Sequence, residues 1–180
     1  MTRWIALLRG VNVGGGNKIA MPALRVSCEG CGFERVSTYI QSGNIVFEAK
    51  GDEASVTAAL RKVLAAEHGL KVPVVVRTAR EMDRLADSHP GLKAGVDPRY
   101  LHIVFLDKKV KQADVKGLDR ARFDPDTFTV DGREIYVTYP NGSGRSKLTI
   151  EVFEKGFGVT ATARNVNTVR ALIELARRST

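Results

Sequence analysis

Residues 3–30, RWIALLRGVNVGGGNKIAMPALRVSCEG, decide how the first half of this chain folds. The apolar run at 3–9 predicts a short strand, and a glycine-rich turn follows it. Met21-Pro22 predicts the start of a helix over 21–30, because proline fits the first turn of a helix. Glycines between a strand and a helix let backbone N–H groups converge, which favours an anion-binding loop.

The segments that follow complete a βαββαβ order, which is that of the ferredoxin-like α+β unit. Ser42-Gly43 is typical of a hairpin turn, and Asp52 is a suitable helix cap. Pro73 predicts that the last strand lies at a sheet edge, because proline cannot donate to an inner ladder. The expected elements are strands over 3–9, 36–41, 44–48 and 72–77 and helices over 21–30, 53–67 and 79–87.

The same order recurs after a stretch rich in proline and glycine. Asp131-Gly132 is a strong hairpin signal, and Asn165 or Asn167 is the expected cap of a closing helix. The expected elements are strands over 100–106, 127–130, 134–139 and 159–163 and helices over 110–118, 146–155 and 167–178.

We therefore predict an α+β chain of two consecutive ferredoxin-like βαββαβ modules with extra helices, forming a compact pair. The predicted organisation is module 1 over residues 1–88, a linker over residues 89–99 and module 2 over residues 100–180.

The composition indicates a globular protein that is compatible with anionic partners. Lys and Arg number 28 against 20 Asp and Glu, which gives a net charge of +8 and suits phosphate-bearing ligands. The basic residues are spread along the chain, so nucleic acid is a less favoured partner than a small anion. No segment reads as a signal peptide or a membrane span, so we expect a cytoplasmic protein without a membrane partner.

The two cysteines, Cys28 and Cys31, form a C-x-x-C pair at the end of the first expected helix. Together with Leu24 they fall at i, i+4 and i+7, which predicts that both thiols line the buried face. A metal site needs further ligands, and the three histidines are scattered along the sequence. We therefore expect no metal site here.

Topology predicts which loops lie together. A right-handed first crossover makes the first two strands of a unit parallel, so loop 9–18 is expected beside turn 41–44. By the corresponding argument, loop 141–147 is expected beside residues 162–165 in the second module. We also expect these two polar clusters to approach each other across a cleft between the modules.

Four ordered blocks resemble the bacterial domain-of-unknown-function family 1697. They are LLRGVNVGGGNK (7–18), TYIQSGNIVFE (38–48), NGSGRSKLT (141–149) and FEKGFGVTATARNVNTV (153–169). Two positions depart from the pattern of that family: Ile150 stands where asparagine is usual, and Val166 stands where tryptophan is usual. The resemblance implies a paired ferredoxin-like architecture, and it implies no activity.

The favoured function is the binding of a small anionic ligand that contains a phosphate or a nucleotide. We expect it to bind in a basic, glycine-rich cleft between the modules. Arginine can grip such groups bidentately, lysine acts as a point charge, and short polar side chains add hydrogen bonds. The predicted ligand-binding residues are Arg9, Asn12, Lys18, Ser42, Asn44, Arg145, Lys147, Arg164 and Asn165.

Plainer interpretations and other function classes stay open. Loop 140–147 lacks the spacing of a phosphate loop, and it also reads as a turn capped by Ser146. His102 is expected to be a surface or satisfied interior histidine rather than a general base. The alternatives are an enzyme that acts on a phosphorylated or carboxylated substrate, and a nucleic-acid or protein interaction module. The sequence identifies no catalytic residue and no cofactor.

Overall fold

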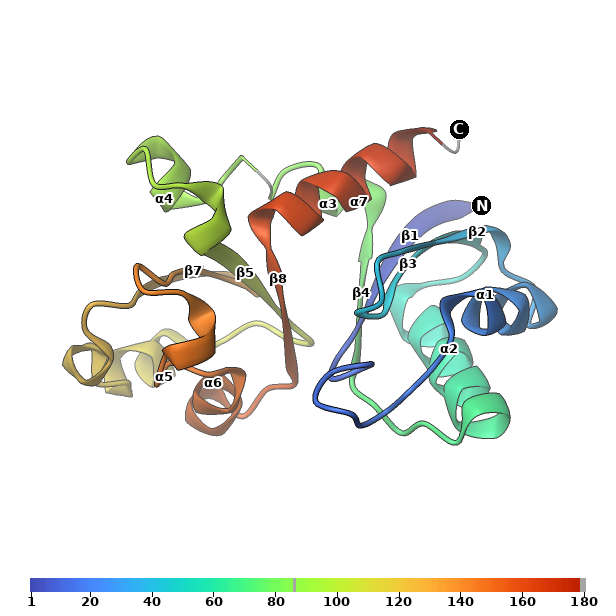
Figure 1. Cartoon of the computed structure of the whole chain (residues 1–180), viewed down its shortest axis with the longest axis horizontal. Coiled ribbons are helices and arrows are strands. Elements are labelled where there is room, and N and C mark those ends of the chain that lie inside the picture. The colour runs from blue at the N-terminus through green and yellow to red at the C-terminus, as the bar shows by residue number, and fades with distance from the viewer. Residues whose placement is uncertain (86, 179–180) are drawn as a thin grey trace. The chain divides into compact units, whose positions relative to one another are not determined.

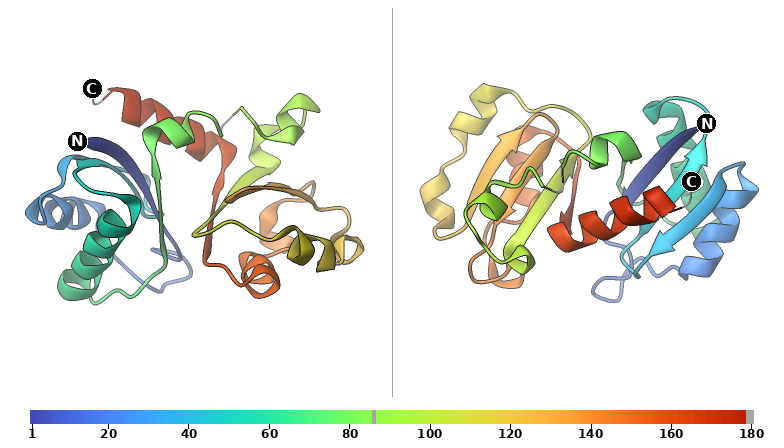
Figure 2. Two further views of the ribbon diagram at one scale, coloured as in Figure 1. Left: turned by 180° about the vertical axis from the view of Figure 1, so that it is seen from behind. Right: turned by 90° about the horizontal axis from the view of Figure 1, so that it is seen from above.

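A computed structural model describes residues 1–85 and 87–178, and these form two compact units. The first unit comprises Met1–Asp83 and the C-terminal segment that begins at Ala171, and the second comprises Arg84–Arg170. Each unit contains one four-stranded antiparallel sheet with helices packed on it (Figures 1 and 2). The expected α+β class with two ferredoxin-like modules is confirmed.

The sheet of the first unit has the strand order β2-β3-β1-β4, in which β1 is a central strand. Its strands are β1 (Thr2–Leu8), β2 (Glu34–Tyr39), β3 (Asn44–Ala49) and β4 (Val74–Thr78). In this register Ile5 of β1 lies between Val46 of β3 and Arg77 of β4. Strand β4 is an edge strand that begins directly after Pro73, as the proline predicted.

Helices α1 (Met21–Gly30) and α2 (Glu53–His68) cover one face of this sheet (Figure 1). Helix α2 begins at Asp52, whose side chain accepts a hydrogen bond from the Ser55 backbone N–H at 2.8 Å. Hydrogen bonds from Ser55 lower the pKa of Asp52. Buried apolar side chains from β1, β3 and both helices fill the core, and the rings of Phe33 and Phe47 stack with centroids 4.3 Å apart.

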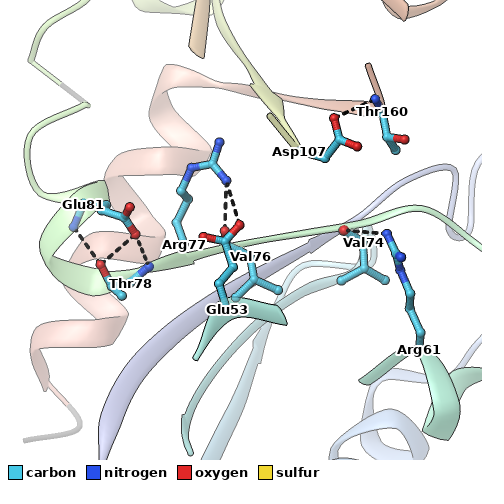
Figure 3. Close-up of polar contacts among 9 residues, drawn as sticks. All are labelled: Glu53, Arg61, Val74, Val76, Arg77, Thr78, Glu81, Asp107 and Thr160. Atoms are coloured by element: carbon cyan, nitrogen blue, oxygen red, sulfur yellow. Dashed lines mark hydrogen bonds and ion pairs between the residues drawn. The ribbon is translucent and has the colours of Figure 1, made fainter. Parts of the chain in front are cut away.

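Arg77 lies on the face of the sheet that points away from α1. Its side chain is only 1% exposed, and its guanidinium donates to the Val76 carbonyl at 2.9 Å and lies 3.9 Å from the Glu53 carboxylate (Figure 3). Next to it, Thr78 and Glu81 form the capping box of the short helix α3 (Ala79–Met82). Arg77 therefore serves the packing of the first unit.

The second unit repeats the topology with the strand order β6-β7-β5-β8. Its strands are β5 (Leu101–Leu106), β6 (Thr127–Asp131), β7 (Glu134–Thr138) and β8 (Ala161–Asn165). Its helices are α4 (Pro90–Lys93), α5 (Gln112–Gly117), α6 (Ile150–Phe157) and the first turns of α7 (Val166–Arg178), with 3₁₀ turns η1 (Pro98–Tyr100), η2 (Arg120–Phe123) and η3 (Ser143–Arg145). Phe153 of α6 is fully buried against Phe128 of β6, with ring centroids 5.3 Å apart.

Several expected elements have different bounds in the structure. The expected helix over 146–155 begins only at Ile150, because Ser146 and Thr149 have extended backbone and residues 146–149 are not helical. The expected strand over 159–163 runs from Ala161 to Asn165. The helix expected over 79–87 ends at Met82, and residue 86 of that range lies outside the described residues.

The expectation that both cysteines are buried is wrong for one of them. Cys28 is buried on the inner face of α1, whereas Cys31 follows the last helical residue and is exposed. Helix α1 ends at Gly30, so the helical periodicity that would have turned Cys31 inward stops one residue too early. Burial raises the pKa of Cys28 to about 12, which keeps its thiol protonated at neutral pH.

The unit boundaries fall at residues 83/84 and 170/171, whereas the sequence placed module boundaries at 88 and 100. Residues 89–99 belong to the second unit and contain α4 and η1. His89 of this segment is buried, and its ring accepts a hydrogen bond from the Gly91 N–H at 3.0 Å. The C-terminal part of α7 belongs to the first unit, where the Ala176 carbonyl accepts a hydrogen bond from Arg3 at 2.8 Å.

Replacement of Gly43 by alanine should destabilise the first unit. Gly43 has φ +74°, and an added Cβ would come within 2.7 Å of the Leu8 Cβ. The left-handed conformation alone costs a non-glycine residue about 1–2 kcal/mol, and the overlap with β1 adds to that cost. We expect Gly43→Ala to lower the urea midpoint clearly more than Gly69→Ala, which has a similar φ of +65° but open space around its Cβ. Equal effects of the two substitutions would contradict this account.

Candidate functional site

The glycine-rich loop that follows β1 lies beside the turn between β2 and β3, as topology predicted. The Leu8 N–H donates to the Gly43 carbonyl at 2.8 Å, and the Asn12 amide donates to the Gln41 carbonyl at 2.8 Å. These two bonds join residues about 30 positions apart in the sequence. Loop 9–18 and turn 40–43 therefore form one surface of the first unit.

Asn12 holds the glycine-rich loop closed. Its Oδ1 accepts from the Ile19 N–H at 2.9 Å, and its Nδ2 donates to the Ile19 carbonyl at 2.8 Å. Asn12 has φ +56°, a left-handed conformation that asparagine tolerates better than most residues. Its amide is thus engaged with backbone groups at both ends of the loop and at the neighbouring turn.

A hollow of about 430 Å³ opens on this loop. It is lined by Asn12, Gly15, Lys18, Ile19 and Ala20. Lys18 is exposed, and its side chain makes no hydrogen bond or ion pair with another described residue. Arg9 lies on the same loop, where its backbone N–H donates to the Pro73 carbonyl at 3.0 Å, but it does not line this hollow.

Ser42 and Asn44 organise the neighbouring turn. Asn44 is fully buried, and its Nδ2 donates to the Tyr39 carbonyl at 3.0 Å and to the Ser42 Oγ at 2.9 Å. Both contacts lie within the hairpin. The buried amide of Asn44 therefore stabilises the turn between β2 and β3.

In the second unit, Arg145 and Lys147 line a smaller hollow of about 150 Å³. Its other wall is the segment before β6, which supplies Arg122, Asp124 and Asp126. The described part of the chain offers no hydrogen-bond or ion-pair partner to the side chains of Arg145 and Lys147. Three cations and two carboxylates thus face one small space.

Ser146 ties the two walls of this hollow together. Its Oγ donates to the Asp126 carboxylate at 2.5 Å and accepts from the Leu148 N–H at 2.8 Å. The Tyr139 hydroxyl donates to the Leu148 carbonyl at 3.0 Å, which anchors the end of the loop in the core. Lys147 is thus held between two fixed neighbours.

The hollow places loop 141–147 beside residues 122–126, whereas residues 162–165 were the expected neighbours. The strand order explains the difference. Strand β6 lies directly beside β7, and Thr127 pairs with Thr138, so the segment before β6 meets the loop after β7. Strand β8 is separated from β7 by β5.

The side chains of Arg164 and Asn165 on β8 donate hydrogen bonds to other groups of the second unit. The Arg164 guanidinium is buried and donates to the Thr162 hydroxyl at 2.9 Å and to the Ala163 carbonyl at 2.7 Å, and burial lowers the pKa of Arg164 to about 10. The Asn165 amide donates to the carbonyls of Pro98, Arg99 and Leu101, each at 3.0 Å. Its Oδ1 accepts from the Asn167 N–H, so Asn165 caps α7 as expected.

Two histidines of the second unit, the buried His89 and the half-buried His102, lie outside both hollows. The His89 Nδ1 accepts from Gly91, so its Nε2 carries the proton and donates to the Val137 carbonyl at 3.1 Å. His102 packs edge-on against Tyr139, and its buried Nδ1 has no hydrogen-bond partner among the described residues. Burial lowers the pKa of both histidines. His102 is therefore a half-buried histidine whose exposure lies between the two expected cases.

The site predicted from the sequence did not include Arg122, Asp124 or Asp126. The signal that could have found them is the Asp131-Gly132 hairpin. A tight turn there fixes the register of β6 on β7, so residues before Thr127 must lie beside residues after Thr138.

Fold and site together define an α+β protein of two ferredoxin-like units, each with a hollow that carries exposed cations. The chain belongs to a protein family of unknown function, DUF1697, whose model matches residues 1–136. A similar solved structure is that of the conserved bacterial protein SP0830 from Streptococcus pneumoniae. It is 22% identical, has a TM-score of 0.70, and the match covers 97% of this chain and 98% of that chain. No match was found among curated proteins.

The structural likeness shows the shared fold. The two departures from the family pattern lie away from the hollows: Ile150 packs against the core of the second unit, and Val166 is a buried residue of α7. Among the described residues, no helix combines the length and apolar character needed to cross a membrane.

Acidification should destabilise the second unit through its histidines. Burial holds the pKa of His89 below its ordinary value of 6.5, so the unfolded chain binds a proton that the folded chain resists. The contribution of His89 to the free energy of unfolding is therefore complete above about pH 7 and decreases as the pH falls toward about 5. Ordinary carboxylates have pKa values of about 4, so they titrate below this range. We expect this fall in the free energy of unfolding to be smaller for His89→Asn, whose side chain can still accept the Gly91 N–H. An unchanged pH dependence in that variant would rule out His89 as a cause.

Proposed function

We propose that this protein binds a small anionic ligand through a phosphate or carboxylate group, with the second-unit hollow as the site. The observation that carries the proposal is the convergence of Arg122, Arg145 and Lys147 on one hollow of about 150 Å³. Asp124 and Asp126 line the same hollow and offset part of this charge, so three cations against two carboxylates leave one excess positive charge that an anion would neutralise. Arg145 and Lys147 have no carboxylate partner among the described residues, so their charges face the hollow's solvent.

The geometry suits a tetrahedral or planar oxyanion. A guanidinium presents paired N–H donors that match two oxygens of a phosphate or carboxylate, and the lysine ammonium adds a compact positive charge. Asp126 already accepts the Ser146 hydroxyl, which occupies one of its oxygens. Asp124 stands at the rim as an acceptor, so a ligand hydroxyl or amine beside the anionic group would find a partner there.

The size of the hollow supports recognition of the anionic group rather than of a whole nucleotide. Pockets that enclose drug-sized ligands measure roughly 300–1,000 Å³, and this hollow has about half of the lower figure. A phosphate of a larger molecule fits inside it while the remainder extends into solvent. Phosphate esters and pyrophosphates of several kinds are therefore acceptable ligands.

Arg145→Ala should abolish this binding. The test is a titration of the protein with inorganic phosphate, pyrophosphate and citrate, followed by isothermal calorimetry and by the shift in melting temperature. Loss of charge-assisted hydrogen bonds of about 1.5–3 kcal/mol corresponds to an affinity lower by roughly ten- to hundredfold. Lys116→Ala, an exposed lysine on α5 outside the hollow, is the matched control and should bind like the unaltered chain.

Two results would contradict the proposal. One is the absence of any response of the unaltered protein to all three anions at millimolar concentration. The other is equal affinity in Arg145→Ala and Lys116→Ala, since a general effect of positive charge would then explain the binding. A steep loss of affinity with added salt toward RNA or DNA, with no response to the small anions, would instead favour a nucleic-acid module.

A further inference from the structure

The turn beside the glycine-rich loop of the first unit holds a residue in a conformation that it disfavours. Ile40 has φ +49°, in the left-handed region, and its side chain is 52% exposed. A β-branched residue there is a genuine outlier, because its side chain crowds the backbone. Burial of the side chain does not compensate for this strain. Glycine or asparagine would occupy the position more easily.

The other residues with positive φ outside glycine have local explanations. Asn12 and Asn17 are asparagines, and both bond across the loop that they close. Arg35 lies at an irregular point of the β2–β3 pairing, where its guanidinium is 3.5 Å from the Glu48 carboxylate. Ile40 has no such contact among the described residues. Strained residues of this kind gather at binding sites.

A second exposed β-branched side chain lies close by. Val13 on the glycine-rich loop is 64% exposed, and its neighbour Asn12 donates to the carbonyl of Gln41, the neighbour of Ile40. Each apolar side chain is thus one residue away from the bond that joins loop and turn. Val13 and Ile40 give this surface an apolar part that lies outside the lining of the hollow.

The same surface is positively charged and hollowed. Residues 9–20 and 40–43 include Arg9 and Lys18 and contain no Asp or Glu. The hollow of about 430 Å³ on the loop is lined by Lys18 together with Ile19 and Ala20, and its volume is within the range of small-molecule sites. A ligand that matches this surface has a negative charge and an apolar portion.

We propose that this surface of the first unit is a binding site for a small amphipathic anion, in which a phosphate or carboxylate is joined to an acyl chain or an aromatic ring. Lys18 faces the charged group, and Val13 and Ile40 cover the apolar portion. The site shares no residue with the second-unit hollow, so it stands independently of the function proposed above. Recognition of the apolar portion distinguishes it from a site for free phosphate.

The test compares phenyl phosphate with inorganic phosphate in an Arg145→Ala background, which removes the contribution of the second-unit hollow. We expect phenyl phosphate to bind at least tenfold more tightly than phosphate. Lys18→Ala should weaken binding of both probes. Ile40→Asn should raise the melting temperature, because asparagine relieves the strain, and should abolish the preference for phenyl phosphate.

Val26→Asn is the matched control, since Val26 is 63% exposed and lies on α1, outside loop 9–18 and turn 40–43. It should leave both affinities unchanged. Val13→Asn provides a second test of the apolar part without any change at the strained residue. Light scattering of each variant reports whether the same surface joins two copies of the chain.

Four results would overturn the proposal. They are equal affinity for the two probes, an unchanged preference in both Ile40→Asn and Val13→Asn, a lower melting temperature of Ile40→Asn, and conversion of a dimer to a monomer by Ile40→Asn. The last result would identify the surface as an interface between copies. A response of the unaltered chain to phosphate that disappears in Arg145→Ala concerns the second-unit hollow alone, so the two proposals fail separately.

Discussion

The antiparallel pairing of one central strand with two neighbours positions everything else in each unit. In the first unit β1 pairs with β3 and β4, and this pairing sets where the chain leaves the sheet. The Leu8 N–H bonds to Gly43 on one side, and the Arg9 N–H bonds to Pro73 on the other. The glycine-rich loop therefore starts between two fixed points. Strand β5 has the same place in the second unit, where β7 and β8 flank it.

Much of this architecture could be predicted because its signals are local. The capping residue Asp52, the hairpin turn at Asp131-Gly132 and the helix-starting Pro22 each act within a few residues of themselves. The sheet-edge position of β4 followed from the missing N–H of Pro73. The helix expected over 146–155 failed at its start, because residues 146–149 are extended or irregular and periodicity alone does not locate the first helical residue.

The candidate sites were harder to predict because they depend on contacts between distant segments. Arg122 faces Arg145 and Lys147 only because β6 and β7 pair in one particular register. The asparagines show a second difficulty, which is that the sequence does not reveal where a polar side chain forms its hydrogen bonds. Asn12, Asn44 and Asn165 have the polar groups that a ligand site needs, but each amide is engaged with backbone carbonyls of its own unit. Side-chain type indicates a capacity for hydrogen bonding, whereas its direction is set by the fold.

In the two proposed sites, recognition therefore rests on cations and apolar side chains. Exposed charges in contact with water contribute little each, because solvent and salt screen them. The second-unit hollow brings three cations and two carboxylates to a small volume, and its excess of one positive charge suits a compact anion. The surface around Lys18 has fewer charges and a wider hollow, so charge alone would hold a ligand there only weakly. Apolar contact with Val13 and Ile40 would supply the missing affinity, since burial of apolar area is not reduced by salt. In this proposal, the strained Ile40 contributes to ligand binding rather than to the stability of the fold.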